Sequence, residues 1–447
     1  MVSEAKPEKA PDDVQPFRVA LAGLGTVGAA TVSILQETAN LLAARAGSSI
    51  EIVAVSARNR NRDRGVDCSV YRWEDDPIAF ADADDIDLVV EMIGGADGPA
   101  FALAKASLQN GKSLVTANKA MVAHHGGVLA ALAEASGAAF RFEAAVAGGI
   151  PAIKALAEGL AANQIHRISG ILNGTCNYIL STMEAEKAGF DHVLEAAQRE
   201  GYAEADPTFD VEGVDTAHKL AILAAIGFGV VPDFGGVSTK GISSIASVDI
   251  EYAATLGYRI KLLGIVTRGG DGLVQSVQPC LVERGHALAQ VMGVTNAVQI
   301  EADRVGTVVL EGPGAGGNAT ASAIVADIVD IARARQAHTP AFGVSSQALT
   351  KAMRGSEDLA MGRFYIRLIV EDRIGVVADI AGCLRDADVS IASLIQRGRD
   401  EDGGVFVVMT THEAREAKMR VAITELAKVP SLRFPPVVIR IMEFAET

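Results

Sequence analysis

The sequence lacks the features of disulfide-stabilised, zinc-binding or membrane proteins. Its 447 residues include only four cysteines, which lie far apart and form no C-x-x-C pair, so we expect reduced thiols in a cytoplasmic protein. No run of about 18 uncharged apolar residues is present, which predicts a soluble protein without a membrane partner. Residues 1–16 are charged and proline-containing without an apolar core. We expect them to form a disordered tail, neither a signal peptide nor an anchor.

Basic residues are in the minority. The chain has 40 Lys and Arg against 55 Asp and Glu, a formal net charge of -15, and this charge would repel a phosphate backbone. We therefore expect no nucleic-acid partner. What the chain does have is 49% apolar residues and 45 glycines, typical of a globular protein with many turns. Its length predicts two or three domains.

Short β-rich runs alternate with helical patterns from Phe17 onward. The predicted strands are 17–23, 50–57, 87–94, 113–118 and 139–146. Helical patterns at 98–110 and 128–137 lie between them. Because strands that alternate with helices form parallel sheets, this order predicts an α/β fold with a Rossmann-type doubly wound sheet.

The first strand leads into the glycine turn "AGLGTVGAA". Gly23, Gly25 and Gly28 fit G-x-G-x-x-G, in which the first glycine allows the turn, the second lets the backbone approach a pyrophosphate, and the third lets helix and strand pack closely. A purely structural glycine turn is the alternative, but the surrounding strand pattern favours a dinucleotide. The predicted cofactor contacts are Gly23, Leu24, Gly25, Thr26, Val27 and Gly28, together with Gly94 at the end of the third strand.

The second strand ends in "VAVSARNRNRDRG", where an acidic residue would favour NAD and an arginine would favour NADP. No carboxylate stands at the strand end, and four arginines follow in an otherwise acidic chain. We predict a preference for NADP, with NAD also accepted. Arg58 is the best-placed phosphate contact and Arg60 the second. A solvated basic loop is the alternative, because every second residue points away from any single ligand.

Five further segments occur in order: "TANKAMVAHHGG" (116–127), "FEAAVAGGIPAIKALAEGLAANQI" (142–165), "ILNGTCNYIL" (171–180), "GYAEADPTFDVEGVDTAHKLAIL" (201–223) and "GPGAGGNATASAIVADI" (312–328). Together they resemble homoserine dehydrogenase, and the resemblance runs from Phe17 to about Leu349. The resemblance implies reduction of L-aspartate 4-semialdehyde to L-homoserine with a nicotinamide cofactor, on the route to threonine and methionine. With 16 residues before Phe17, we expect the monofunctional form.

Reduction of an aldehyde requires a hydride, a proton donor for the developing alkoxide, and groups that hold the substrate's amino-acid end. Lys219 lies in "DTAHKLAILAAIGF", where burial would make it a usable proton donor, and Asp215 shares its helix face. The spacing alone also permits a simple surface ion pair between Lys219 and Asp215. The resemblance implies that Lys219 is the proton-donating lysine and that Asp215 binds substrate. It likewise places Gly201, Glu204 and Asp210 in the substrate pocket, where the residues alone also permit a solvated acidic loop.

Lys119 follows the fourth predicted strand, at the edge where doubly wound sheets bind ligands. The resemblance places it beside nicotinamide and substrate, as a second catalytic lysine. It also implies a monovalent cation, sodium or potassium, held by the side chain of Glu143 and by the carbonyl oxygens of Val146, Gly148 and Ile150. Oxygen ligands suit a hard cation, although a glycine turn without an ion is the alternative.

The loop from Gly314 to Gly317 is expected to cover the nicotinamide, with Gly317 as a cofactor contact. The chain has "NATAS" where the family usually has a proline before the threonine.

Cys176 raises a rival hypothesis, because some aldehyde dehydrogenases form a thioester on a cysteine. Its setting "NGTCNY" offers no recognisable paired base, so we interpret Cys176 as a packed small residue.

The last segment, 363–447, follows a polar linker at 350–362. Its order reads strand, helix, strand, strand, helix, strand, which predicts a ferredoxin-like domain. The turn "EDRIGVVADIA" resembles an ACT domain, which implies that an amino acid binds near Asp372 and Gly375 between paired modules. We expect threonine as the effector, a homodimer or homotetramer, and crowding of the helix start by any side chain at 375. An ACT-like fold that only dimerises is the alternative.

These patterns divide the chain into a tail (1–16), a Rossmann domain (17–147), an α+β catalytic and dimerisation domain (148–349), a linker (350–362) and an ACT domain (363–447). Two other functions remain open. The chain could be a non-catalytic amino-acid sensor, although the pair of Lys119 and Lys219 argues against that. It could also be an ACT-containing 2-hydroxy acid dehydrogenase, although the discontinuous substrate domain and the Arg, Glu and His catalytic set of phosphoglycerate dehydrogenase do not appear.

Overall fold

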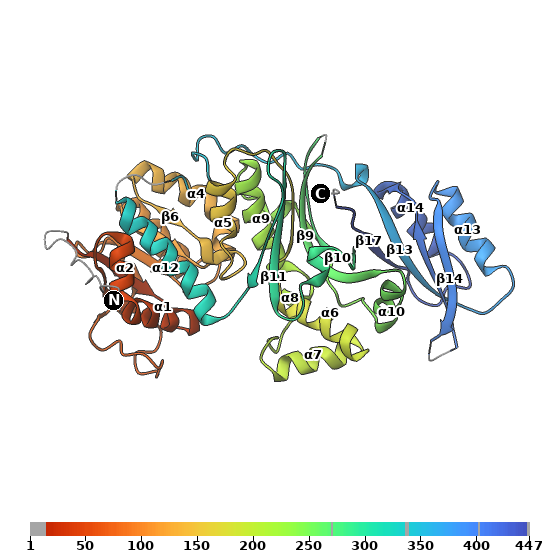
Figure 1. Ribbon diagram of the computed structural model, residues 1–447, viewed down its shortest axis with the longest axis horizontal. Helices are drawn as coiled ribbons and strands as arrows, with labels where there is room; N and C mark the ends of the chain where they lie inside the picture. The colour runs from red at the N-terminus through yellow and green to blue at the C-terminus, as the bar shows by residue number, and fades with distance from the viewer. Residues whose placement is uncertain (1–14, 270, 336–338, 401–402, 445–447) are drawn as a thin grey trace, which may run out of the picture. The chain divides into compact units, whose positions relative to one another are not determined.

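The computed structural model describes residues 15–269, 271–335, 339–400 and 403–444 (Figure 1). Most of the predicted tail, residues 1–14, lies outside the described residues. The chain forms two units, each built from three separate segments. The first unit comprises Met1–Asn163, His218–Phe234 and Leu310–Ala352, and the second comprises Gln164–Ala217, Gly235–Val309 and Met353–Thr447. The domain boundaries given above stay predictions.

The first unit contains a six-stranded sheet in the order β3-β2-β1-β4-β5-β6, with every neighbouring pair parallel. The strands are β1 (Phe17–Ala22), β2 (Ile50–Ser56), β3 (Arg72–Trp73), β4 (Leu88–Glu91), β5 (Ser113–Thr116) and β6 (Phe140–Arg141). This is the strand order of a Rossmann fold, so the predicted fold class is confirmed. Two details differ from the predicted elements: β3 was not foreseen, and the strand expected over 139–146 ends at Arg141, before a 3-10 turn at Glu143–Ala145.

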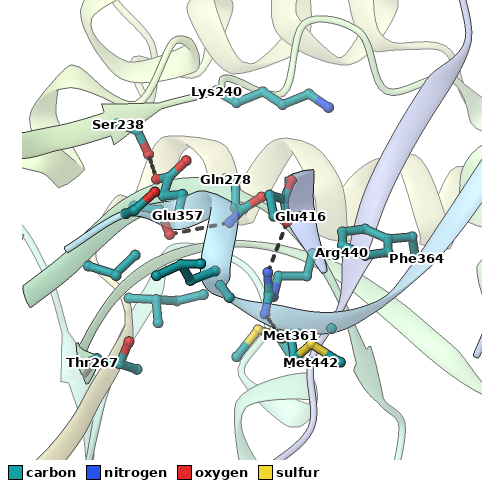
Figure 2. A pocket seen from close by; sticks show the side chains of 18 of the residues that line it. Ser238, Lys240, Thr267, Gln278, Glu357, Met361, Phe364, Glu416, Arg440 and Met442 are labelled. Carbon is teal, nitrogen blue, oxygen red and sulfur yellow. Dashed lines mark hydrogen bonds and ion pairs between the residues drawn. The ribbon is translucent and has the colours of Figure 1, made fainter. Parts of the chain in front are cut away.

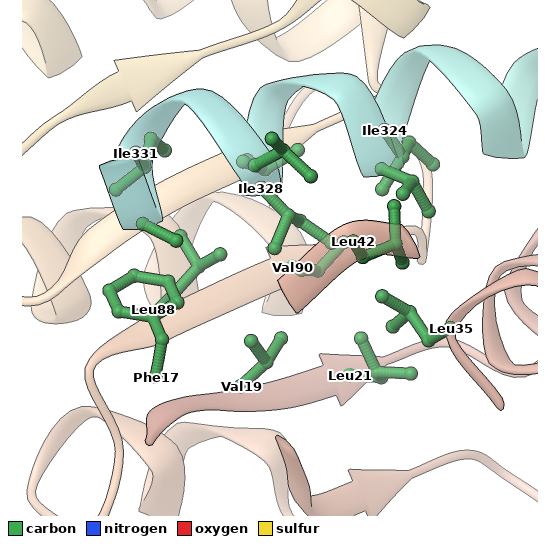
Figure 3. Close-up of a cluster of buried hydrophobic side chains, with 14 of the residues drawn as sticks. Phe17, Val19, Leu21, Leu35, Leu42, Leu88, Val90, Ile324, Ile328 and Ile331 are labelled. Carbon is green, nitrogen blue, oxygen red and sulfur yellow. The ribbon is translucent and has the colours of Figure 1, made fainter. Parts of the chain in front are cut away.

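The helices of the first unit come from distant parts of the chain. They include α1 (Thr26–Glu37), α2 (Ala39–Ala46), α3 (Pro99–Gln109), α4 (Lys119–Ser136), α5 (Ala152–Lys154) and α12 (Gly317–Ala334). Helix α12 lies beside α1 and α2 (Figure 1) and packs Ile324 and Ile328 onto Val19 and Val90 of the sheet (Figure 3). A segment some 300 residues after β1 therefore completes the core of the dinucleotide-binding fold.

The second unit is organised around a mixed sheet in the order β12-β11-β7-β9-β10-β17-β13-β15-β14. Its strands are β7 (Ile165–Ile171), β9 (Tyr258–Gly269), β10 (Gly272–Glu283), β11 (Thr295–Ala302), β12 (Gly306–Pro313), β13 (Met361–Val370), β14 (Ile391–Arg399), β15 (Val405–Thr411) and β17 (Val437–Ile441), with β8 (Val237–Thr239) on β10 and β16 (Ala414–Arg415) on β13. Its helices are α6 (Gly174–Glu186), α7 (Phe190–Arg199), α8 (Thr208–Val211), α10 (Ser247–Thr255) and α11 (Ala287–Gln290), and α9 (Val214–Phe228) begins in this unit.

The C-terminal part has the order β13, α13 (Val376–Asp386), β14, β15, α14 (Glu416–Leu426), β17, with a short β16 before α14. Its antiparallel strands run β17-β13-β15-β14, which confirms the predicted ferredoxin-like arrangement. Strand β17 also pairs in parallel with β10, with Cys280 opposite Arg440 and Leu281 opposite Ile441. The strands of the C-terminal module thus continue the mixed sheet of the second unit, whose other part is formed by β7 and β9 to β12. No helix within the described ranges is long and apolar enough to cross a bilayer.

Candidate active site

The three positions of the first turn favour glycine for different structural reasons. Gly23 has φ +102°, and a Cβ there would lie 2.5 Å from the Met92 carbonyl oxygen. A Cβ on Gly28 would lie 2.1 Å from the Gly23 carbonyl oxygen. Gly25, which caps α1, has no atom within 4 Å of its Cβ position. Packing therefore accounts for Gly23 and Gly28, whereas the space above Gly25 is what a pyrophosphate approaching the backbone needs.

A second helix begins at the same turn. A Cβ on Gly317, the first residue of α12, would lie 3.1 Å from Cγ2 of Thr26, the first residue of α1. A Cβ on Gly148 would lie 2.6 Å from the carbonyl carbon of Gly314, so the 314–317 loop also packs on the loop after β6. Because a helix N-terminus carries partial positive charge and free N–H groups, two such ends next to the glycine turn favour an anion.

The arginine loop after β2 is held by Arg64, which sequence reasoning did not select. Its Nε donates to the Leu24 carbonyl oxygen in the glycine turn at 3.1 Å. Arg58 and Arg60 are exposed, and the Arg60 guanidinium lies 5.7 Å from the centre of the Trp73 ring. A cavity of about 260 Å³ is lined by Arg60, Arg64 and Trp73 among others. The loop thus presents several guanidinium groups beside the cofactor turn.

The loop after β4 is shaped by Glu91, a buried acid that sequence reasoning missed. Its Oε1 accepts the N–H groups of Ile93 and Gly94 at 2.7 and 3.0 Å, and its Oε2 accepts the Thr116 hydroxyl at 2.5 Å. Gly94 has φ +88° and no atom within 4 Å of its Cβ position. The carboxylate therefore fixes an open glycine at the carboxyl end of β4, where this fold binds its ligands.

Lys119 is the first residue of α4 and is half-buried. Asn118 caps this helix, because its Oδ1 accepts the Met121 N–H at 3.1 Å. The Asn118 Nδ2 donates to the Gly95 carbonyl oxygen at 2.6 Å. Two hydrogen bonds thus fix the residue before Lys119, which lies at the carboxyl edge of the sheet as the sequence predicted.

Glu143 lies in a buried cluster of charges. Its two carboxylate oxygens accept the N–H groups of Ile153 and Lys154, each at 2.9 Å, and its own N–H donates to Asp327 Oδ2 at 2.8 Å. Burial, with the nearby Asp327 carboxylate as a second cause, raises the pKa of Glu143 to about 7. The Lys154 ammonium balances this cluster, 3.2 Å from Asp327 and 2.6 Å from Asp330.

The predicted cation ligands follow directly after this cluster. Gly148 has φ +58°, and the Ile150 carbonyl oxygen accepts the Ala152 N–H at 2.8 Å. One carboxylate with carbonyl oxygens, including that of Val146, is a donor set that suits a hard cation, since each oxygen has more than one lone pair. The cation itself stays a prediction.

In the second unit, Asn173 brings two of the predicted substrate residues together. Its Nδ2 donates to Asp210 Oδ1 at 2.7 Å and to Asp215 Oδ2 at 2.9 Å. Its Oδ1 caps α6 by accepting the Cys176 N–H at 2.8 Å. Sequence reasoning missed this asparagine, although an Asn directly before a helical pattern is a recognised capping signal. Cys176 is fully buried with its Sγ 3.2 Å from the Asp210 carbonyl oxygen, as expected of a packed residue.

Gly201 and Glu204 are not part of this carboxylate pair. They lie on an exposed turn between α7 and α8, where Gly201 has φ +79° and the Glu204 carbonyl oxygen accepts Gln198 Nε2 at 3.0 Å. Their predicted substrate roles stay predictions.

Lys219 is buried on α9, in the part of that helix that belongs to the first unit. The preceding His218 stacks on Phe234, with ring centres 4.1 Å apart, and its Nε2 lies 3.3 Å from Nε2 of His124 on α4. The helix that carries Lys219 is therefore tied to the helix that begins with Lys119.

The predicted effector residues lie at the start of α13. Asp372 is exposed and forms an ion pair with Arg399. Gly375 caps the helix with φ +92°, and a Cβ there would meet nothing within 4 Å. The expected crowding at position 375 is therefore wrong for this chain. What disfavours a side chain there is the left-handed backbone conformation.

The strand order, the glycine turn and the lysine at the start of α4 define a nicotinamide-dinucleotide oxidoreductase fold with an added ferredoxin-like module. Family models described as "Homoserine dehydrogenase, NAD binding domain", "Homoserine dehydrogenase" and "ACT domain" match residues 23–143, 151–329 and 364–430. The chain belongs to the homoserine dehydrogenase family and is an oxidoreductase. Membership of this family decides against the two alternative hypotheses, a non-catalytic amino-acid sensor and a 2-hydroxy acid dehydrogenase.

Relatives named homoserine dehydrogenase match this chain over nearly its whole length. The homoserine dehydrogenase of Pseudomonas aeruginosa is 42% identical, covering 96% of this chain and 99% of the relative, and that of Neisseria gonorrhoeae is 41% identical with the same coverage. The crystal structure of a homoserine dehydrogenase from Thiobacillus denitrificans has a TM-score of 0.90 at 41% identity, covering 96% of this chain and 99% of that one. A hyperthermophilic archaeal homoserine dehydrogenase in complex with NADPH has a TM-score of 0.60 at 26% identity, covering 71% of this chain and 97% of that one.

Proposed function

We propose that this protein reduces L-aspartate 4-semialdehyde to L-homoserine with NADPH, on the route to threonine and methionine. The observation that carries the substrate assignment is the carboxylate pair of Asp210 and Asp215, held by one asparagine amide. A carboxylate is an acceptor with several lone pairs, and the shared amide places two carboxylates close together. They suit the ammonium group of an amino-acid substrate.

The proposed chemistry needs a proton at the aldehyde oxygen. A nicotinamide cofactor, when bound, would supply the hydride for the carbonyl carbon. Lys219, buried on α9, donates the proton to the developing alkoxide, and Lys119 stabilises the negative charge. Burial excludes water from the ammonium group, which strengthens its interaction with an alkoxide.

NADPH is the preferred coenzyme in this proposal. The loop after β2 carries Arg58, Arg60 and Arg64 beside the glycine turn, with no carboxylate at the strand end to bind a ribose hydroxyl. The NADPH complex of the archaeal relative is consistent with this choice. Exposed guanidinium groups can bind the 2′-phosphate of NADPH, and they leave no unpaired charge buried when the phosphate is absent.

Regulation and assembly extend the proposal. The ACT domain would bind an amino acid, with threonine as the first candidate, in a cytoplasmic homodimer or homotetramer. A sodium or potassium ion would be held near Glu143.

The decisive experiment follows the absorbance of NADPH and NADH with L-aspartate 4-semialdehyde as substrate. The expected result is substrate-dependent oxidation, with a higher kcat/KM for NADPH and with homoserine as the product. Absence of turnover with both coenzymes, in a protein that binds NADPH, would reject the substrate.

A further inference from the structure

A cavity of about 670 Å³ opens on the second unit where the ACT domain joins the catalytic sheet (Figure 2). Strands β8, β9 and β10 line it on the catalytic side, and β13, β17 and α14 line it on the ACT side. It contains none of the residues assigned above to substrate, cofactor, cation or effector. The cavity is therefore distinct from the site already described.

Charged groups of both signs line this cavity. Arg440 on β17 forms an ion pair with Glu416 on α14, with Nη1 and Oε2 3.1 Å apart, and Figure 2 shows Lys240 apart from this pair. Glu357 accepts the Ser238 hydroxyl and lies 3.6 Å from Arg420. These carboxylates would repel a purely anionic ligand, and the guanidinium groups would repel a purely cationic one. A zwitterion is the class of ligand that both signs can bind.

Lys240 supplies a positive charge at the cavity wall. Its Nζ donates to the Val438 carbonyl oxygen at 2.6 Å, which uses one of its three protons. Within the described ranges no carboxylate lies within ion-pair distance of this ammonium. An incoming carboxylate could therefore bind Lys240 without displacing an existing partner.

The remaining lining supplies an apolar surface and carboxylates for an ammonium group. Phe364 and Met442 are buried at the cavity wall, and Glu357 and Glu416 each keep acceptor capacity beyond their present partners. We propose that this cavity binds a free amino acid, with its carboxylate on Lys240 and its ammonium on Glu357 or Glu416, and that it is the effector site. The proposal rests on the proposed regulation by an amino acid.

The cavity wall is connected to the proposed substrate residues by two short steps. Gly241, which follows Lys240, packs so closely that a Cβ there would lie 2.3 Å from the Val211 carbonyl oxygen. The same carbonyl accepts the Ile242 N–H at 2.9 Å, and Val211 directly follows Asp210. A ligand that pulls on Lys240 would therefore shift the backbone that holds Asp210. Binding to one position of this segment better than to another is what an allosteric effector requires.

The test compares Lys240→Met with Lys418→Met in the full-length protein. Both variants remove one lysine ammonium, but Lys418 lies on α14 outside the cavity and pairs with Asp388. Titration calorimetry with threonine, serine, methionine and lysine measures binding, and NADPH oxidation measures activity. We expect at least one amino acid to bind the wild type and inhibit it. Lys240→Met should weaken that binding about 10-fold or more, the scale of a charge-assisted hydrogen bond, whereas Lys418→Met should leave it within about twofold.

A second variant, Thr267→Trp, fills the cavity without a change of charge. It should abolish binding, and both cavity variants should keep kcat and KM within about twofold in the absence of effector. Wild-type affinity in both cavity variants overturns the proposal. Loss of binding in Gly375→Leu alone would also overturn the proposal, because it would place the effector at α13. An active enzyme that binds none of the four amino acids rejects the effector site alone, whereas an enzyme without reductase activity rejects the proposed function.

Discussion

Replacing Lys154 by methionine should destabilise the first unit by about 3 kcal/mol. The lysine ammonium lies 3.2 Å from Asp327, whose side chain is 1% exposed, and 2.6 Å from Asp330. Removing one partner of a buried ion pair typically costs about 3–5 kcal/mol, because the other charge stays buried without compensation. The lower end applies here, since the Lys154 side chain is itself 24% exposed and some of its charge is already screened by water.

The pH dependence and a double variant identify the cause. Burial raises the pKa of Asp327, and loss of the Lys154 ammonium would raise it further. A carboxyl whose folded-state pKa lies above its unfolded value binds more protons when folded, so stability falls as the pH rises between the two values. The defect of Lys154→Met should therefore be largest at pH 8 and shrink toward pH 5. Adding Asp327→Asn, which keeps an acceptor for the Glu143 N–H, should recover most of the loss at pH 8.

The chain offers a local probe for this measurement. Trp73 is the single tryptophan and lies on β3 in the first unit, so its fluorescence during urea unfolding reports on that unit. Lys105→Met, at an exposed position on α3, is the matched control and should change the unfolding free energy by no more than about 0.5 kcal/mol. A loss below about 1 kcal/mol in Lys154→Met, or a loss equal at pH 5 and pH 8, would refute the buried-pair argument.

Three further predictions concern the proposed reaction. Lys219→Ala should lower kcat by about 100-fold or more with nearly unchanged NADPH binding, the scale of a general acid, and near-normal turnover would reassign this lysine to structure. Arg58→Ala should raise the KM for NADPH far more than that for NADH, and Arg64→Met should weaken both coenzymes because it releases the loop from the glycine turn; steady-state kinetics with each coenzyme distinguishes the two. Asn173→Ala should raise the KM for the semialdehyde about 10-fold or more and lower the melting temperature, since it removes a helix cap and the donor between two carboxylates. An unchanged KM would separate this residue from substrate binding.

Local sequence patterns predicted the dinucleotide-binding sheet well because its signals are local. A glycine turn between an apolar strand and a helix needs only a few consecutive residues, and the observed β1, β2, β4 and β5 lie within the predicted ranges. The strand expected over 139–146 fails for a reason that no periodicity contains. Glu143 turns inward to accept two backbone N–H groups at 153 and 154, so the chain leaves the sheet after Arg141.

The residues that sequence reasoning missed act through distant partners. Asp327 accepts the Glu143 N–H across 184 positions, and Arg64 reaches Leu24 across 40. Asn173 binds Asp215 across 42 positions. An acid or amide in such a role resembles any other polar residue in a single sequence, since its function depends on which segments the fold brings together. Only the helix cap of Asn173 left a local signal.

The joining of the ACT domain to the catalytic sheet changes how its regulation can be tested. A ferredoxin-like unit read from the sequence suggests a module that can be cut off near Gly362 without harm. In the structure, β17 pairs with β10, and Met442 packs in the core that includes Leu263 and Cys280. Deletion would expose backbone groups of β10 and open that core, so lost activity in a truncated chain would not identify a regulatory role. Because the two parts share one sheet, substitutions inside the cavity are the perturbations that separate effector binding from folding.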